Sequence, residues 1–186
     1  MSEDARLLKL IEPVLKHEGS VLSLDPDDPG LATKFGVSLR WLRSCKDIDP
    51  QTGYMVGDLD HDHDVDADDI REMTRIDAIR IYQAQWWDRY RYGLIEDDAV
   101  AGKLLDFSVH TGPGRAHRLI QVACNNVGIP GQLAVDGILG QQTIAAINSR
   151  PSQQYLLAML RLEGIKFYTS LNQPKYLRGW INRALD

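Results

Sequence analysis

The chain has 186 residues, of which 44% are hydrophobic and 25% are charged, and its net charge is −5. These values are ordinary for a soluble globular protein, and no apolar run approaches the ~20 residues of a membrane-spanning helix. The two cysteines, Cys45 and Cys124, make neither a metal-binding spacing nor a disulfide framework. We therefore expect both to be free, buried thiols.

The charge is distributed unevenly along the chain. Seven aspartates lie within residues 58–69, and without them the net charge would be +2. Residues 141–186 carry six Lys or Arg against two acids, which fits either approach to an anionic cell wall or a plainly solvated helix surface. The N-terminal stretch has acids before its apolar residues and no small-residue cleavage site, so we expect no Sec signal peptide.

Hydrophobic periodicity predicts a mainly α protein. Helices are expected at residues 3–17, 38–45, 70–92, 98–111, 115–127, 141–148, 152–171 and 174–184. Pro13 lies inside the first of them and should kink or break it. Strand signals are weak, and the stretch 20–37, rich in Pro, Gly and Asp, predicts a small hairpin or an irregular loop.

The first candidate for catalysis is Glu18, at the end of the first apolar helix and directly before Gly19. Cleavage of a glycosidic bond needs a carboxylic acid as proton donor, and a second group that activates water or stabilises developing charge. Position alone favours a plain exposed helix-end residue, and the following DPDDPG fits ordinary turn chemistry. However, the spacing from Glu18 to Asp27 and Thr33 is similar to the Glu-x8-Asp-x5-Thr arrangement of phage-type lysozymes.

A longer resemblance covers nearly the whole chain. HEGS followed by DPDDPGLATKFGVS resembles the signature of glycoside hydrolase family 108, the N-acetylmuramidases of phage endolysins and bacterial secretion activators. WWDRYR and LLDFSVHTGPGRAHRLIQ are similar to later segments of that family, and VDGILGQQTIAAIN resembles the start of its peptidoglycan-binding C-terminal part. The resemblance implies a lysozyme-like helical fold in which Glu18 is the essential acid. It places the motif aspartate at Asp28, whereas the lysozyme spacing places it at Asp27. The sequence departs from the family pattern at Ser20, Leu31 and His110.

Candidate substrate contacts follow in two groups. Aromatic rings stack on sugar rings, so the cluster in WWDRYR fits either a sugar subsite or core packing. In the family the LLDFSVHTG segment lines the cleft, and the resemblance implies that its polar side chains contact the substrate. Together these candidates are Trp86, Trp87, Tyr90, Asp106, Ser108 and His110.

The acidic insertion DLDHDHDVDADD has the spacing of a calcium-binding loop, and it resembles an EF-hand or dockerin-type loop. Calcium takes six to eight oxygen ligands, which the loop could supply. His63 stands where glycine normally makes the sharp turn, and Asp69 replaces the usual bidentate glutamate. The alternatives are an empty acidic loop, or a transition metal bound through His61 and His63. The expected calcium ligands are Asp58, Asp60, Asp62, Asp64, Asp66 and Asp69.

The sequence as a whole predicts an endolysin-like muramidase that needs no cofactor for catalysis and hydrolyses the β-1,4 bond between N-acetylmuramic acid and N-acetylglucosamine. A lytic transglycosylase is the alternative, and a non-catalytic calcium-dependent cell-wall-binding module is less favoured. The expected lobes are a catalytic one at 1–95, with its acidic insertion at 46–69, and a helical one of peptidoglycan-binding type at 96–186, forming one compact unit.

The expected partner is bacterial peptidoglycan, without nucleic acid or stable membrane insertion, for a monomeric protein. We expect the protein to be cytoplasmic in the producing cell and to act on the wall after release, through a holin or on lysis. The sequence does not distinguish a bacteriophage lysin from a bacterial autolysin.

Overall fold

A computed structural model describes residues 3–23, 32–50, 52–128 and 132–186 of the chain. The chain folds into two compact units, one formed by residues 12–84 and the other by residues 1–11 together with 85–186. The expected lobes at 1–95 and 96–186 do not coincide with these units and stay a prediction.

Helix α1 (Glu3–Glu18) begins with acidic residues, which favour a helix N-terminus, and ends at the glutamate of interest. Gly19 has a φ of +76° and donates its N–H to the carbonyl of Leu15 at 3.0 Å, so it stops the helix in the left-handed conformation. The helix continues through Pro13, so the expected break is wrong, whereas the alternative, a kink, stays a prediction. Pro13 lies on the exposed face, where water can hydrate the carbonyl that loses its hydrogen bond.

The smaller unit contains a short antiparallel hairpin, β1 (Thr33–Lys34) and β2 (Val37–Ser38), followed by α2 (Leu39–Leu42), α3 (Ala67–Glu72) and α4 (Arg75–Tyr82). The hairpin confirms the small hairpin expected within 20–37. Helix α2 begins where expected because the Ser38 hydroxyl accepts the N–H of Trp41 at 3.3 Å. Asp66 and Thr74 form capping boxes at the starts of α3 and α4.

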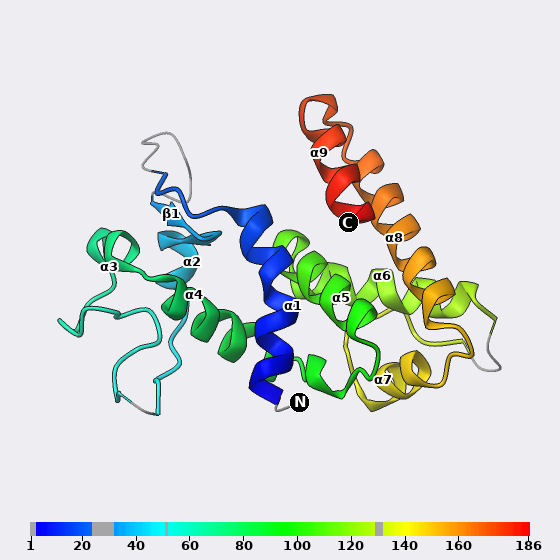
Figure 1. Cartoon of the computed structure of the whole chain (residues 1–186), viewed down its shortest axis with the longest axis horizontal. Coiled ribbons are helices and arrows are strands. Elements are labelled where there is room, and N and C mark those ends of the chain that lie inside the picture. Colours follow the sequence, from blue (N-terminus) through cyan, green and yellow to red (C-terminus); the bar gives the residue numbers. More distant parts are fainter. Residues whose placement is uncertain (1–2, 24–31, 51, 129–131) are drawn as a thin grey trace. The chain divides into compact units, whose positions relative to one another are not determined.

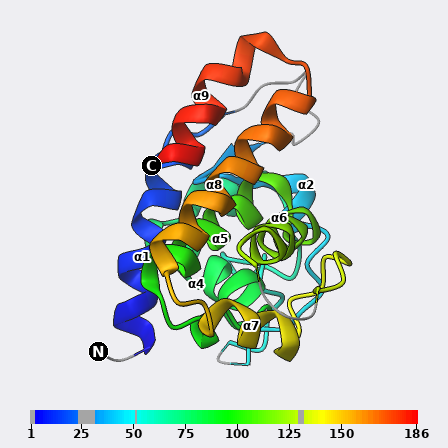
Figure 2. The ribbon, with the colours of Figure 1, turned by 90° about the vertical axis from the view of Figure 1, so that its right-hand side faces the viewer.

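The larger unit consists of helices that pack on one another. After a π-helical turn, η1 (Gln83–Asp88), and a 3-10 turn, η2 (Tyr92–Leu94), the described chain forms α5 (Asp98–Thr111), α6 (Pro113–Asn126), α7 (Gln141–Asn148), α8 (Gln153–Ser170) and α9 (Pro174–Leu185). Helices α5, α6 and α8 pack together, and α9 runs back along α8 (Figures 1 and 2). The expected mainly α fold is therefore confirmed.

The centre of the larger unit is largely apolar, and it also holds buried polar side chains, among them an ionic cluster of Lys103, Asp106 and Arg183. Val100, Leu104, Leu105 and Phe107 of α5 are fully buried, together with Leu156 and Leu160 of α8. Cys124 is buried here and Cys45 in the smaller unit, and both are free thiols, as expected. Among the described residues, no helix is long and apolar enough to cross a membrane.

Candidate active site

Glu18 lies directly against the turn of the β1–β2 hairpin. Lys34 pairs with Val37, so Phe35 and Gly36 form a two-residue turn, and both have positive φ angles, of 52° and 76°. This is the pattern of a type I′ turn, which suits the twist of a hairpin. A Cβ atom placed on Gly36 would lie 2.6 Å from Cγ, 2.7 Å from Oε2 and 2.8 Å from Cβ of Glu18. The Glu18 side chain therefore occupies space that any other residue at this position would fill.

Two further contacts hold the hairpin in place. The Tyr82 hydroxyl of α4 donates a 2.8 Å hydrogen bond to the carbonyl of Phe35, in the middle of the turn. Ser23 pairs with Thr33 through two backbone hydrogen bonds of 2.9 and 3.0 Å. The chain that leaves Glu18 is thus tied to the strand that carries Thr33.

The other expected catalytic residues are placed only in part. Thr33 lies in β1, two residues before the turn that contacts Glu18. Asp27 and Asp28 lie outside the described residues, so their roles stay predictions.

Four of the six expected substrate contacts are buried in the larger unit. Trp86 and Trp87 are 9% and 1% exposed, and Asp106 and Ser108 are 2% and 0% exposed. The π-helical turn alters the spacing of the two tryptophans from that of an α-helix. The two tryptophans lie in the core, which agrees with the second interpretation of these aromatics, core packing. That the four buried residues contact the substrate stays a prediction, and their burial argues against it.

Asp106 is the acid of the buried ionic cluster. Its Oδ1 accepts a hydrogen bond from Nε of Arg183 of α9 at 2.9 Å and forms an ion pair with Nη2 at 2.8 Å. Its Oδ2 lies 3.4 Å from Nζ of Lys103. Lys103 also donates to the carbonyl of Arg183 at 2.8 Å. Burial lowers the pKa of Lys103, and the charge of Asp106 opposes that change. The cluster joins α5 to α9, so its geometry gives Asp106 a structural role.

Tyr90 and His110 are the two expected contacts that remain partly exposed. Nδ1 of His110 lies 2.8 Å from the hydroxyl of Tyr168, and the His110 ring contacts Trp180 edge-on. Of the candidate set, these two have surface that a glycan could reach.

The acidic loop is folded by its own carboxylates. Asp58, 3% exposed, accepts the N–H groups of Asp62 and His63 at 3.1 Å each. Asp69, 1% exposed, accepts the N–H groups of Leu59 at 2.6 Å and Asp66 at 2.7 Å. His63 takes the left-handed conformation, with a φ of +78°, at the position where such loops normally have glycine.

The carboxylate oxygens of this loop converge in two groups. Ligand atoms of Asp58, Asp60 and Asp69 lie within 4.8 Å of one another, and so do those of Asp64, Asp66 and Asp69. Partial desolvation and the neighbouring carboxylates raise the pKa of Asp60, while the charge of Asp62 is the main cause of the raised pKa of Asp64. The loop therefore concentrates negative charge that a bound cation would neutralise.

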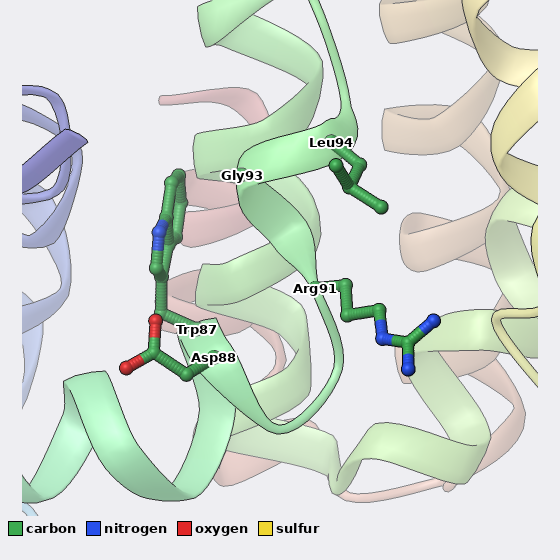
Figure 3. Close-up of a pocket in the computed structure, with 5 residues that line it drawn as sticks. All are labelled: Trp87, Asp88, Arg91, Gly93 and Leu94. Carbon is green, nitrogen blue, oxygen red and sulfur yellow. The ribbon is translucent and has the colours of Figure 1, made fainter.

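The larger unit also has an open hollow of about 380 Å³, lined by Trp87, Asp88, Arg91, Gly93 and Leu94. Its two charged side chains, Asp88 and Arg91, lie on opposite sides of the ribbon and point away from each other (Figure 3). Because these groups do not converge, the hollow offers no arrangement for acid–base chemistry.

Comparison with known proteins places this arrangement in a family. The family model for glycosyl hydrolase 108 matches residues 11–112, more than half of the chain. The chain belongs to the glycosyl hydrolase 108 family. A second model, described as a predicted peptidoglycan domain, matches residues 115–185. These two segments indicate a glycoside hydrolase that acts on peptidoglycan, and the resemblance found in the sequence is confirmed.

A solved structure supports the lysozyme-like helical fold expected for a glycosyl hydrolase 108 protein. The structure of Brucella abortus SagA is similar over 97% of this chain and 90% of that chain, with a TM-score of 0.69 and 23% sequence identity. At this identity the likeness shows the fold alone. A comparison with curated proteins found no match.

Within the family segment, sequence reasoning did not predict the contacts that surround Glu18. The sequence pattern places Tyr82 in an apolar helix stripe, yet its hydroxyl reaches the Phe35 carbonyl. The sequence did contain a signal for the turn. Phe35 and Gly36 lie between two short extended segments, and a glycine in such a two-residue connection is typical of a β-hairpin. No sequence pattern showed that this turn would lie against Glu18.

Proposed function

We propose that this glycosyl hydrolase 108 protein is a muramidase, which hydrolyses the β-1,4 bond between N-acetylmuramic acid and N-acetylglucosamine in bacterial peptidoglycan. The observation that carries the proposal is Glu18 itself. It is a carboxylic acid at a helix end, inside the segment that matches the family, with its side chain enclosed on one side by the Gly36 turn.

In this mechanism Glu18 protonates the oxygen of the leaving sugar. Asp28, or Asp27, and Thr33 position the attacking water or stabilise the charge that develops on the cleaved sugar. This division of roles rests on the sequence motif. The position of Thr33 supports it, because Thr33 lies in β1, two residues before the turn that contacts Glu18.

The test is Glu18→Gln, which keeps the size of the side chain but cannot donate a proton in the same way. General acid catalysis contributes ~10²–10⁴-fold, so lysis of outer-membrane-permeabilised cells, measured by turbidity, should fall by at least a hundredfold. Glu12→Gln is the matched control because Glu12 is exposed on the same helix and pairs with Arg75. The assignment is wrong if Glu18→Gln keeps more than about a tenth of wild-type lysis.

The reaction products distinguish a muramidase from a lytic transglycosylase. Hydrolysis adds one water across the cleaved bond, whereas a transglycosylase leaves a 1,6-anhydro sugar that is lighter by that water. Mass spectrometry of digested sacculi should show the hydrated product. A series of anhydro products would assign the transglycosylase reaction to Glu18 instead.

We propose further that the loop at residues 58–69 binds Ca²⁺ as a structural ion, without a part in catalysis. The support is the convergence of its carboxylate oxygens and the calcium-loop spacing of its aspartates. Calorimetric titration of the protein with CaCl₂ should give a saturable heat. Absence of heat would leave an empty acidic loop, and tighter binding of Zn²⁺ or Ni²⁺ would favour a site that uses His61 and His63.

A further inference from the structure

The Glu18 side chain lies close against a glycine. Gly36 has no side chain, and a Cβ atom at its position would come within 2.6–2.8 Å of three side-chain atoms of Glu18. Cβ is bonded to the backbone of α1 and cannot be moved by a change of rotamer, whereas Cγ moves only when χ1 changes. Any side chain at position 36 would therefore shift the turn against α1 or force Glu18 into another orientation.

We propose that the Phe35–Gly36 turn fixes the orientation of the Glu18 carboxyl group, with Gly36 as a positioning residue and Tyr82 as the residue that holds the turn. This inference rests on the proposed function, in which Glu18 is the proton donor. Neither Gly36 nor Tyr82 is proposed to touch the substrate. Both act through Glu18.

The role of Tyr82 follows from the backbone of the turn. Phe35 has a φ of +52°, a conformation that costs energy in a residue with a Cβ and persists only where surrounding contacts maintain it. The Tyr82 hydroxyl donates a 2.8 Å hydrogen bond to the carbonyl of this residue, and Tyr82 is 1% exposed. The hydrogen bond is part-buried, and it fixes the turn relative to helix α4.

The hairpin strands complete the support. Thr33 pairs with Ser38 on one side and with Ser23 on the other. The backbone that leaves Glu18 at Gly19 therefore returns within a few residues to pair with the strand before the turn. The hairpin is thus held through Thr33 at its base and through the Phe35 carbonyl in its turn. Because Gly36 lies against Glu18, a displacement of the turn is transmitted to the Glu18 side chain.

The test compares two glycine substitutions. Gly36→Ala introduces the clash with Glu18 and the cost of a positive φ angle. Gly53→Ala introduces a similar φ cost, because Gly53 has a φ of +80°, but a Cβ there would meet no atom within 4 Å. The difference between the two variants isolates the contact with Glu18 from backbone strain.

We expect Gly53→Ala to lower the melting temperature slightly and to keep wild-type lysis. Gly36→Ala should reduce kcat on purified sacculi by about a hundredfold, the effect of a misplacement of about 1 Å in an active site. Its binding to sacculi, measured by co-sedimentation, should stay within twofold of wild type. A role in fold stability alone would lower the melting temperature without this split between kcat and binding.

Tyr82→Phe provides a second test that leaves the space at Gly36 unchanged. Loss of its hydrogen bond should reduce kcat by about two- to tenfold with little change in binding. If Gly36→Ala does not fold, Tyr82→Phe decides the question, and an unchanged kcat in that variant overturns the proposal.

The combination of Glu18→Gln with Gly36→Ala shows whether Gly36 acts through Glu18. The double variant should have the same residual activity as Glu18→Gln alone, since the group that Gly36 positions is already lost. If Glu18→Gln is inactive but a folded Gly36→Ala variant keeps more than about a tenth of wild-type kcat, the positioning role of Gly36 is overturned and the proposed function is not. An active Glu18→Gln variant instead overturns the proposed function, so the two failures are distinguishable.

Discussion

Asp106 illustrates how a residue in a family motif can serve the fold. Its carboxylate lies between Arg183 and Lys103, and all three side chains are less than 10% exposed. Breaking such a buried cluster leaves uncompensated charge, which costs about 3–5 kcal/mol. If Asn replaced Asp106, the side chains of Lys103 and Arg183 would be two buried cations facing a neutral amide.

We therefore predict that Asp106→Asn lowers the melting temperature by about 6–20 °C, given a shift of about 2–4 °C per kcal/mol for a protein of this size. Asp98→Asn is the control on the same helix, because Asp98 pairs with Arg6 and Lys9 near the surface and should cost only about 1 kcal/mol. Differential scanning calorimetry measures both. An unchanged melting temperature for Asp106→Asn, together with weaker binding to sacculi, would restore Asp106 as a substrate contact.

The second catalytic carboxylate is a prediction from the motif. Asp28→Ala should reduce lysis more than Asp27→Ala, because the DPxDPG match assigns the motif position to Asp28. If the carboxylate activates a water, the carboxyl groups should lie ~6.5–9.5 Å apart and the product should have inverted anomeric configuration. Proton NMR of the fresh product measures the configuration. Equal and small losses from both variants would remove this loop from catalysis.

Among the structural elements, most helices were predicted well because each combines a clear apolar stripe with local start and stop signals. The single helix expected at 70–92 is wrong, because the chain breaks after α3 and Thr74 caps a new helix, α4. Helix α7 lies at the expected residues, and α5 agrees as well, since Asp97 caps its start and Gly112 its end. The π-helical turn at Gln83–Asp88 was not predicted, because it adds one residue to a turn whose apolar residues look helical in either case. Elements set by local chemistry are therefore visible in the sequence.

Contacts set by tertiary packing were not visible in the same way. The distance between Gly36 and Glu18 depends on how the hairpin folds back on α1, and no periodic pattern encodes that. The burial of Trp86 and Trp87 likewise depends on the helices around them. The motif identified the candidate site, whereas the structure was needed to find which groups enclose it.

The acidic loop is an element whose stability should depend on calcium. Partial desolvation and repulsion raise the pKa of Asp60, and repulsion from Asp62 is the main cause of the raised pKa of Asp64. For an acid whose pKa is higher in the folded state, the stabilising contribution is present below its usual pKa of 3.8 and is lost as pH rises through the folded value. In EDTA the loop should therefore weaken the fold above about pH 4, and bound calcium should remove that loss.

We predict that millimolar calcium raises the melting temperature at pH 6, and that the rise shrinks as pH falls toward 4. At a hundredfold excess over Kd the gain is ~2.7 kcal/mol, or about 5–10 °C. Equal magnesium should have little effect. Asp60→Ala with Asp62→Ala should abolish the rise, whereas Asp68→Asn, a change at a position that is not an expected ligand, should keep it. Identical melting curves in calcium and EDTA would contradict a calcium site.

At the scale of the whole molecule, the two family segments meet inside one compact unit. Helix α5 lies in the glycosyl hydrolase 108 segment, whereas α6, α8 and α9 lie in the segment that resembles a peptidoglycan domain. A Cβ atom on Gly164 of α8 would lie 2.4 Å from the ring of Phe107 of α5, so these helices approach closely. The ionic cluster of Asp106 and Arg183 also joins the two segments. The boundary near residue 113 is thus not a boundary between independent cores.

We therefore predict that residues 1–112 alone do not form a stable enzyme. Truncation would expose the buried face of α5, including Leu104, Leu105 and Phe107, and would leave Asp106 without Arg183. The truncated chain should lack a cooperative thermal transition by circular dichroism and should not lyse permeabilised cells. Co-expression with residues 113–186 should restore both properties, because the missing helices would again cover α5. A truncated chain that melts cooperatively and lyses cells at the wild-type rate would show that the C-terminal segment serves only to bind the wall.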